Sequence, residues 1–224
     1  MTLNLFDDEP QPYAAPELIA PGAMLLRGFA RGHAAALMQA VEQLLLAAPL
    51  RHLVVPGGRT MSVAMSNCGA LGWVSDCSGY RYSATDPLSG RPWPAMPTDW
   101  SSLASRAARD AGFEGFAANA CLINCYQSGA RMGLHQDRDE GGKTGDFSAP
   151  IVSVSLGLPA VFLFGGLQRK DKITRWPLLH GDVVVWGGPS RLAFHGVAPL
   201  KEGVHAALGA RRVNLTFRRV RVDD

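Results

Sequence analysis

Strict alternation of apolar and polar residues marks the last strand that the sequence predicts. In residues 212–218, Val213, Leu215 and Phe217 would point to one face of a strand, because neighbouring side chains alternate between faces. The opposite face would carry Arg212, Asn214, Thr216 and Arg218. An ordinary half-buried strand alternates in the same way, with its polar face in water, so exposure of these four is the simplest interpretation.

Two segments have helical spacing instead. In residues 33–48, apolar residues recur at i, i+1, i+4, i+7 and i+8, and Pro49 follows as a stop. Residues 98–111 repeat the pattern, with Gly112 as the C-terminal signal. We expect both helices to pack on one face of a sheet.

From residue 119 onward, short apolar or alternating runs are separated by glycine-rich turns. Eight short antiparallel-type strands favour a double-sheet jelly roll. The fold class predicted is therefore mostly β with flanking helices (α+β): a jelly-roll, or double-stranded β-helix, core over about residues 119–220 and an N-terminal helical and lid region. The predicted strands are residues 121–126, 131–136, 151–156, 161–164, 172–178, 182–186, 191–197 and 213–220, preceded by a short one at 23–29.

Composition limits the domain organisation. The 224 residues, 47% hydrophobic and 18% charged, suit one globular domain over residues 21–224. Residues 1–20, rich in Pro, Asp, Glu and Ala, are predicted to be a mobile leader, and residues 51–97, rich in Gly, Pro and aromatic rings, to hold short strands and turns. No apolar run approaches a membrane span, no secretory signal is evident, and the cysteines lack C-x-x-C spacing, so we expect a cytoplasmic protein with reduced thiols.

Two histidines and one aspartate suggest a metal site. His135 and Asp137 are two residues apart, so on a strand they would project side by side. His195 lies in an apolar run, where a histidine needs a reason. Two histidines and one carboxylate form the open-faced ligand set of non-haem Fe(II) oxygenases. A surface turn explains an isolated H-x-D, and a zinc hydrolase could use the same residue types.

The arginines of the last strand favour the oxygenase. Guanidinium groups pair bidentately with carboxylates, so Arg212 and Arg218 suit a dicarboxylate near the metal. Six residues span roughly 20 Å of ideal strand. Their side chains must therefore converge, or the strand must bend, to hold one small diacid.

Together these motifs resemble the iron- and 2-oxoglutarate-dependent dioxygenases, and among them the bacterial AlkB DNA-repair dealkylases. The resemblance rests on His135-x-Asp137, His195 and Arg212-x-Asn214-x-x-x-Arg218, and it extends over nearly the whole chain. Further stretches that resemble the sequences of this family lie at residues 56–58, 60–65, 71–73, 92–97, 134–137, 150–159, 180–188 and 214–218.

The resemblance implies roles for the central residues. His135, Asp137 and His195 would bind Fe(II). The cosubstrate 2-oxoglutarate would be held by Arg212, Asn214 and Arg218, with Asn124 and Tyr126 from a neighbouring strand. With O2, such an enzyme would hydroxylate an N-methyl group and release formaldehyde, succinate and CO2.

The resemblance also implies a nucleotide-recognition lid over residues 51–97. Trp73 matches the ring that stacks on a damaged base extruded from the helix, with His135 on the other side. Tyr80 and Arg169 match contacts to substrate phosphate. Asp139 matches a position facing the base, where a carboxylate would favour the cationic lesions N1-methyladenine and N3-methylcytosine over their neutral parents. Glu140 is expected to be a solvated turn charge.

The function predicted is therefore direct-reversal repair of alkylated bases in single-stranded DNA, with duplex DNA and RNA left open as substrates, by a monomer that uses Fe(II), 2-oxoglutarate and O2. A net charge of +3 permits nucleic-acid binding without demanding it. The alternatives are a hydroxylase of the same class acting on a protein, lipid or small molecule, and a non-catalytic jelly-roll module that binds metal or nucleic acid.

Overall fold

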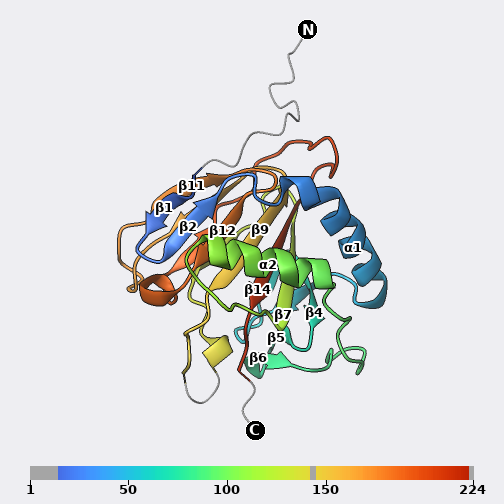
Figure 1. Cartoon of the computed structure of the whole chain (residues 1–224). Helices are drawn as coiled ribbons and strands as arrows, with labels where there is room; N and C mark the ends of the chain where they lie inside the picture. Colours follow the sequence, from blue (N-terminus) through green and yellow to red (C-terminus); the bar gives the residue numbers. More distant parts are fainter. Residues whose placement is uncertain (1–14, 142–144, 222–224) are drawn as a thin grey trace.

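In the computed structural model, residues 15–141 and 145–221 are described, and two facing sheets form the core (Figure 1). Every pair of neighbouring strands is antiparallel. The larger sheet has the order β1 (Glu17–Ala20), β2 (Ala23–Leu26), β12 (Val183–Trp186), β9 (Ile151–Gly157), β14 (Arg212–Arg218), β7 (Ala120–Tyr126), β4 (Thr60–Gly69) and β3 (Arg51–Val54).

The smaller sheet has four strands and faces the larger one across the interior. Its order is β11 (Thr174–Leu178), β10 (Ala160–Phe164), β13 (His195–Val197) and β8 (Met132–His135). Each of the eight strands predicted after residue 119 is present, which confirms the jelly-roll core and the mostly β fold class. Three short 3-10 segments join the strands: η1 (Arg31–His33), η2 (Asp139–Gly141) and η3 (Gly188–Ser190).

Both predicted helices cover the outer face of the larger sheet. Helix α1 (Ala34–Ala47) and helix α2 (Thr98–Asp110) bury apolar residues in one cluster with β7, β9, β12 and β14, and Figure 1 shows α2 lying across these strands. Trp100 of α2 meets Phe217 of β14 edge to face, with ring centroids 6.2 Å apart. The helices therefore buttress the strand that carries the arginines.

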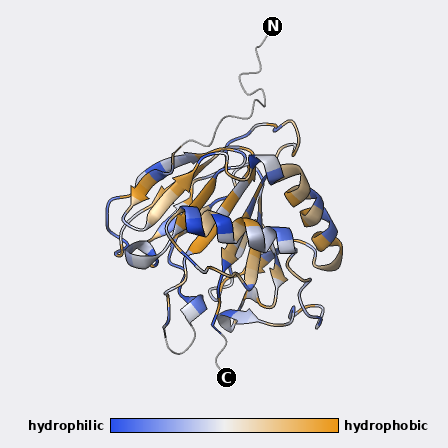
Figure 2. Cartoon of the chain, viewed as in Figure 1, coloured by the Kyte–Doolittle hydropathy of each residue, from blue (hydrophilic) through white to orange (hydrophobic). Residues whose placement is uncertain are grey.

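The alternation of β14 separates two environments. Val213, Leu215 and Phe217 join the cluster under the helices, so the polar residues between them face the smaller sheet. Figure 2 shows the apolar strands of the larger sheet beneath the helices. All seven residues of β14 are buried. Solvent exposure, the simplest interpretation of its polar face, is therefore wrong: these groups line an interior pocket.

The predicted leader contains a strand. Glu17–Ala20 form β1 at the edge of the larger sheet, paired with β2. Glu17 forms an ion pair with Arg27, with 2.7 Å between Oε1 and Nε. The prediction that the mobile leader extends to residue 20 is therefore wrong for residues 17–20. A four-residue strand with only two large apolar side chains is too short for its alternation to be recognised in the sequence. Residues 1–14 lie outside the described part of the chain. The helices of the described residues are too short to cross the hydrocarbon core of a membrane.

The glycine- and aromatic-rich segment divides in two. Strands β3 and β4 extend the larger sheet, whereas β5 (Gly72–Asp76) and β6 (Gly79–Ser83) form a separate hairpin beside its end (Figure 1). Asn67 of β4 anchors the hairpin, because its side-chain amide bonds both the backbone N–H and the carbonyl of Trp73 at 3.0 Å. Trp93 closes against it, donating its indole N–H to the carbonyl of Ser83 at 3.0 Å.

Gly72 permits this close approach of the hairpin to Trp93. A Cβ at Gly72 would lie 2.4 Å from the buried indole of Trp93 and 2.8 Å from the Cβ of Asn67. We expect Gly72→Ala to lower the free energy of unfolding by about 1–3 kcal/mol, as overpacking does, measured by urea denaturation. Gly32→Ala, where no atom lies within 4 Å of the added carbon, is the control, and equal stability of the two variants would contradict this packing account.

Candidate active site

Two histidines face each other across neighbouring strands. His135, the last residue of β8, is the direct cross-strand partner of His195, the first residue of β13, and their ring centroids are 4.4 Å apart. Asp137 lies in the loop two residues beyond β8, not on the strand as its spacing predicted. Its Oδ1 is nevertheless 3.5 Å from Nε2 of His135 and 3.7 Å from Nε2 of His195.

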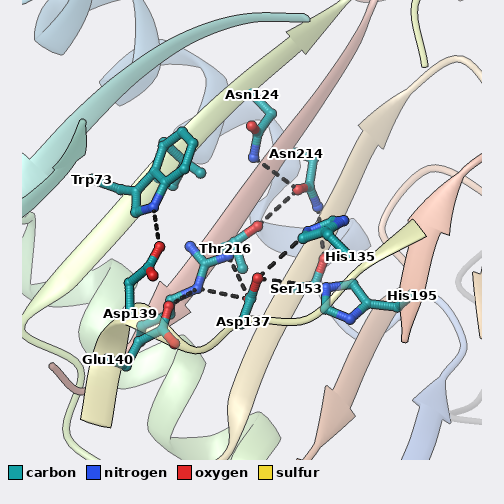
Figure 3. A network of polar contacts seen from close by, with 12 residues as sticks. Trp73, Asn124, His135, Asp137, Asp139, Glu140, Ser153, His195, Asn214 and Thr216 are labelled. Atoms are coloured by element: carbon teal, nitrogen blue, oxygen red, sulfur yellow. Dashed lines mark hydrogen bonds and ion pairs between the residues drawn. The ribbon is translucent and has the colours of Figure 1, made fainter. Parts of the chain in front are cut away.

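These three residues form a cluster that can hold a metal ion. Each offers one ligand atom, and the three atoms lie within 4.8 Å of one another. Figure 3 shows the three side chains converging from the β8 end, the following loop and β13. The arrangement leaves the remaining positions around an ion to the pocket.

Backbone carbonyls orient both imidazoles. Nδ1 of His135 donates to the carbonyl of Gly133 at 2.8 Å, and Nδ1 of His195 donates to the carbonyl of Ala193 at 3.0 Å. A carbonyl only accepts, so Nδ1 carries the proton and the Nε2 lone pairs point at the cluster. Burial, reinforced by the neighbouring His135, lowers the pKa of His195 to about 4, which keeps it a neutral ligand at physiological pH.

An arginine from β14 holds the third ligand. Arg218 donates from Nε and Nη2 to Oδ2 of Asp137, at 3.0 and 2.7 Å. Burial opposes ionisation of Asp137, but the charge of Arg218 outweighs it and holds the pKa of this carboxyl well below its usual range. Because Arg218 uses Oδ2, Oδ1 remains directed at the two histidine Nε2 atoms.

The second arginine of β14 is buried without a carboxylate partner. Arg212 is 1% exposed, its Nη2 donates to Ser155 Oγ at 2.7 Å, and its guanidinium lies 4.8 Å from the ring centre of Tyr126. Among the described residues, its Nε and Nη1 have no hydrogen-bond partner. Burial lowers its pKa. A guanidinium in this position needs an anion, and a ligand carboxylate fits that need.

The side-chain amides of Asn214 on β14 and of its cross-strand partner Asn124 on β7 have different roles. Asn214 is saturated: its Nδ2 donates to Ser153 Oγ and to the Val154 carbonyl, and its Oδ1 accepts from Asn124 and from Thr216 (Figure 3). Asn124 keeps an Oδ1 without a partner among the described residues. Asn214 therefore orients its neighbours, whereas Asn124 retains capacity for a ligand.

One pocket joins the metal cluster to these groups. It is lined by both histidines and by the polar faces of β7 and β14, so the two arginines converge on one space despite their separation along the strand. The lining residues among those predicted as site residues are Asn124, Tyr126, His135, His195, Arg212, Asn214 and Arg218.

Two of the predicted substrate residues, Trp73 and Tyr80, lie on the lid hairpin, and the other two, Asp139 and Arg169, lie outside the lid. Trp73 of β5 donates its indole N–H to Oδ2 of Asp139 at 2.8 Å (Figure 3). It also stacks on Tyr80 of β6, with centroids 5.6 Å apart and 14° between the planes. Asp139 and Tyr80 are exposed. Arg169 lies beside the metal motif, donating to the carbonyl of Leu134 at 3.0 Å with its guanidinium over Phe194.

Comparisons with known proteins agree with this geometry. The family model of the 2OG-Fe(II) oxygenase superfamily matches residues 22–218. The alpha-ketoglutarate-dependent dioxygenases AlkB of Salmonella typhimurium and Escherichia coli are 54% and 52% identical, over 96% of this chain and 97% of each relative. The solved structure of OsALKBH1 superposes with a TM-score of 0.79 at 28% identity, covering 91% of this chain and 99% of that one.

The chain belongs to the AlkB dioxygenases of the 2OG-Fe(II) oxygenase superfamily.

Membership decides between the alternatives that the residues left open. As an AlkB dioxygenase the chain is an enzyme, and its cofactors are Fe(II) and 2-oxoglutarate, the latter also called alpha-ketoglutarate. The zinc hydrolase and the non-catalytic module are therefore set aside. The unpartnered Arg212 and the cluster of two imidazoles and a carboxylate fit a dicarboxylate and an Fe(II) ion in one pocket.

Sequence reasoning missed three residues of this AlkB site. Glu140, expected to be a solvated charge, is 3% exposed and pairs with Arg218 at 3.1 Å and Arg191 at 3.2 Å. Tyr82 donates its hydroxyl to Glu140 Oε1 at 2.8 Å. Arg191 stands in the same apolar run as His195, so the argument that a polar residue there needs a reason would have found it. Glu140 carries no such signal, because its surroundings come from distant segments.

Removing the aspartate tests the metal cluster. We expect Asp137→Ala to lose Fe(II) binding and abolish succinate formation, because two imidazoles alone hold the ion weakly and Arg218 loses its partner. Equilibrium dialysis with Fe(II) under anaerobic conditions measures the binding. Asp146→Ala, which removes an aspartate paired with Arg221 outside the cluster, should bind Fe(II) normally. Normal binding by Asp137→Ala would exclude this residue as a ligand.

Proposed function

We propose that this enzyme oxidatively removes alkyl groups from N-alkylated bases of single-stranded DNA. The observation that carries the proposal is the pocket in which both imidazoles of the metal cluster lie beside the unpartnered guanidinium of Arg212. The aromatic lid reaches the segment just beyond the metal motif, where Trp73 bonds Asp139. The guanidinium suits a dicarboxylate cosubstrate and the lid a flat base. A relative also supports a nucleic-acid substrate: the nucleic acid dioxygenase ALKBH1 of Homo sapiens is 37% identical over 57% of this chain.

The metal set proposed is His135, Asp137 and His195. When bound, Fe(II) with 2-oxoglutarate and O2 supplies the oxidation of the N-alkyl carbon, converting 2-oxoglutarate to succinate and CO2. The chain's own groups orient the ligands: Gly133 and Ala193 carbonyls fix the imidazole tautomers, and Arg218 fixes the carboxylate rotamer. For an N-methyl group, loss of the hydroxymethyl adduct as formaldehyde restores the base.

The dicarboxylate site proposed is built from Arg212 and Arg218. Arg212 offers Nε and Nη1 to one carboxylate, with Tyr126 packed on its guanidinium, and Asn124 lines the same pocket. Arg218 holds Asp137 and faces the metal end, where it meets the other carboxylate. Asn214 acts indirectly by bonding Asn124 and Thr216.

The base site proposed lies between Trp73 and His135. Trp73 supplies a stacking surface, and the side chain of His135 is 39% exposed, so one edge of the metal site can be reached from outside. Asp139 presents a carboxylate at this opening, which attracts a cationic base such as N1-methyladenine or N3-methylcytosine. In the structure this carboxylate accepts the indole N–H of Trp73, so the two residues position each other. Tyr80 and Arg169 flank the opening as phosphate contacts.

The proposal also covers the form of the DNA substrate, the oligomeric state and the cellular compartment. A base already unstacked in single-stranded DNA costs less to place in the pocket than one extruded from a duplex. We propose a monomer, because the site is built from one chain. We place it in the cytoplasm, because all four cysteines are free thiols, as expected in a reducing compartment.

Incubation with methylated single-stranded DNA, Fe(II) and 2-oxoglutarate, followed by base analysis, tests the function. Unmodified bases and formaldehyde should appear together, in equal amounts and only with the methylated strand. Succinate that forms without any loss of methylated base would instead favour a protein, lipid or small molecule as substrate.

Removing the second arginine tests the cosubstrate site. We expect Arg212→Met to weaken 2-oxoglutarate binding by at least ~1.5–3 kcal/mol, the value of a charge-assisted hydrogen-bond pair, while Fe(II) binding persists because Arg212 does not contact the metal cluster. Ligand-free stability should not fall, since the variant removes a buried charge without a counter-ion. Calorimetric titration gives the affinity. Arg211→Gln, at a partly exposed arginine paired with Glu42, is the control, and matching affinities in both variants would refute the assignment.

Removing the lid carboxylate charge tests lesion recognition. Asp139→Asn should lower activity on cationic N1-methyladenine more than on a neutral lesion such as ethenoadenine, because only the first gains from a nearby negative charge. Asp76→Asn, at an exposed lid aspartate paired with Arg81, is the control. Equal losses on both lesions would make Asp139 a turn residue only.

Removing the lid indole tests stacking on the base. Trp73→Ala should weaken binding of methylated oligonucleotide by about 1–3 kcal/mol, the value of one stacked base, and leave 2-oxoglutarate affinity unchanged.

A further inference from the structure

Two hydrogen bonds join the lid hairpin to the segment that follows the metal motif. Trp73 and Tyr82 are direct cross-strand partners on β5 and β6. Trp73 donates to Asp139 and Tyr82 donates to Glu140, each at 2.8 Å, so opposite residues of the hairpin hold consecutive acids of η2. The first bond is exposed and belongs to the base site, whereas the second is partly buried and leads inward.

The inner bond continues to the metal cluster. Oε1 of Glu140, which accepts from Tyr82, also forms an ion pair with Arg218, 3.1 Å from its Nε, and Arg218 in turn holds Asp137. Oε2 of Glu140 accepts from Arg191, whose Nη1 donates to the backbone carbonyl of Asp137 at 2.9 Å. Both branches from Glu140 therefore end on the same metal-ligand residue, one at its side chain and one at its backbone.

The chemistry of Tyr82 suits a fixed donor. Burial, strengthened by the nearby acids, raises the pKa of its phenol well above the usual value, so the hydroxyl keeps its proton and donates. Glu140 and Asp137 compete for one guanidinium, that of Arg218. A hydrogen bond from Tyr82 occupies part of Glu140 and weakens its hold on Arg218, which leaves more of Arg218 for Asp137 and for a cosubstrate carboxylate.

We propose that Tyr82 is a positioning residue that couples closure of the lid on the base to the binding of 2-oxoglutarate, acting through Glu140 and Arg218. The inference rests on the proposed function, because it takes the hairpin as the base site and Arg218 as a cosubstrate ligand. Closure of the hairpin brings the Tyr82 hydroxyl to Glu140, and Arg218 is then placed for the diacid. By reciprocity, 2-oxoglutarate and the methylated strand bind more tightly together than separately.

Calorimetry on protein loaded with Mn(II), which replaces Fe(II) to prevent turnover, measures this coupling. The dissociation constant of 2-oxoglutarate is determined alone and with a saturating methylated single-stranded oligonucleotide. In the unaltered protein the oligonucleotide should tighten 2-oxoglutarate binding at least about fivefold, the lower end of usual coupling between sites. In Tyr82→Phe, which keeps the ring and removes the hydroxyl, the ratio should fall to about one.

Ser75→Ala is the matched control. Ser75 lies on the same hairpin and donates its hydroxyl to the carbonyl of Val54 at 2.6 Å, away from Glu140. This variant therefore also removes one hydroxyl contact between the hairpin and the rest of the protein. It should keep the fivefold ratio. Melting temperatures of both variants show the structural cost of each lost bond, and a Tyr82→Phe protein that is less stable but keeps the ratio would leave Tyr82 as a packing residue and overturn the inference.

The remaining outcomes separate the two proposals. Unaltered protein that binds both ligands without coupling overturns the role of Tyr82 and leaves the proposed function standing. Unaltered protein that binds neither 2-oxoglutarate nor the methylated strand removes the proposed function and this inference with it. Loss of the ratio in Ser75→Ala as well would assign the coupling to the hairpin as a whole and not to Tyr82.

Discussion

The buried ion pair between Arg218 and Asp137 is the contact on which the site depends. It joins the last strand of the larger sheet to the loop beyond β8, two elements that are 81 residues apart in the chain. By occupying Oδ2 it leaves Oδ1 directed at the two imidazoles, and it keeps the carboxyl ionised against the cost of burial. Without it, the carboxylate of Asp137 would have only the two imidazoles beside it. Removing Arg218 would leave this buried carboxylate without its cation, which is strongly destabilising, whereas removing Asp137 leaves Arg218 beside Glu140.

Between the sheets, the polar pocket lies beside apolar packing. One apolar cluster includes Phe162, Phe164 and Trp186, and another includes Met65 and Tyr126, with the pocket between them lined by charged and amide groups. The packing under the helices stabilises the sheet, whereas the pocket retains unsatisfied buried atoms on Asn124 and Arg212. Proteins break the rule of satisfied buried polar groups mainly at functional sites, where a ligand completes the bonding.

The lid connects this interior to the surface. Its hairpin is fixed from beneath by Asn67 and touches η2 through Trp73 and Tyr82. The exposed contact, from Trp73 to Asp139, belongs to the proposed base site, and the partly buried one, from Tyr82 to Glu140, reaches the groups that orient Asp137.

The sequence by itself determined the elements and the chemistry. Alternation predicted β14 and its two faces, repeated short runs predicted the jelly roll, and spacing with the family resemblance selected His135, Asp137 and His195, because side-chain periodicity and ligand type are local properties. Tertiary structure alone decided which charges are buried. Glu140 looks like any acid in a polar turn, and only strands from elsewhere in the chain enclose it with Arg191, Arg218 and Tyr82. Burial depends on neighbours distant in sequence, and no local pattern records them.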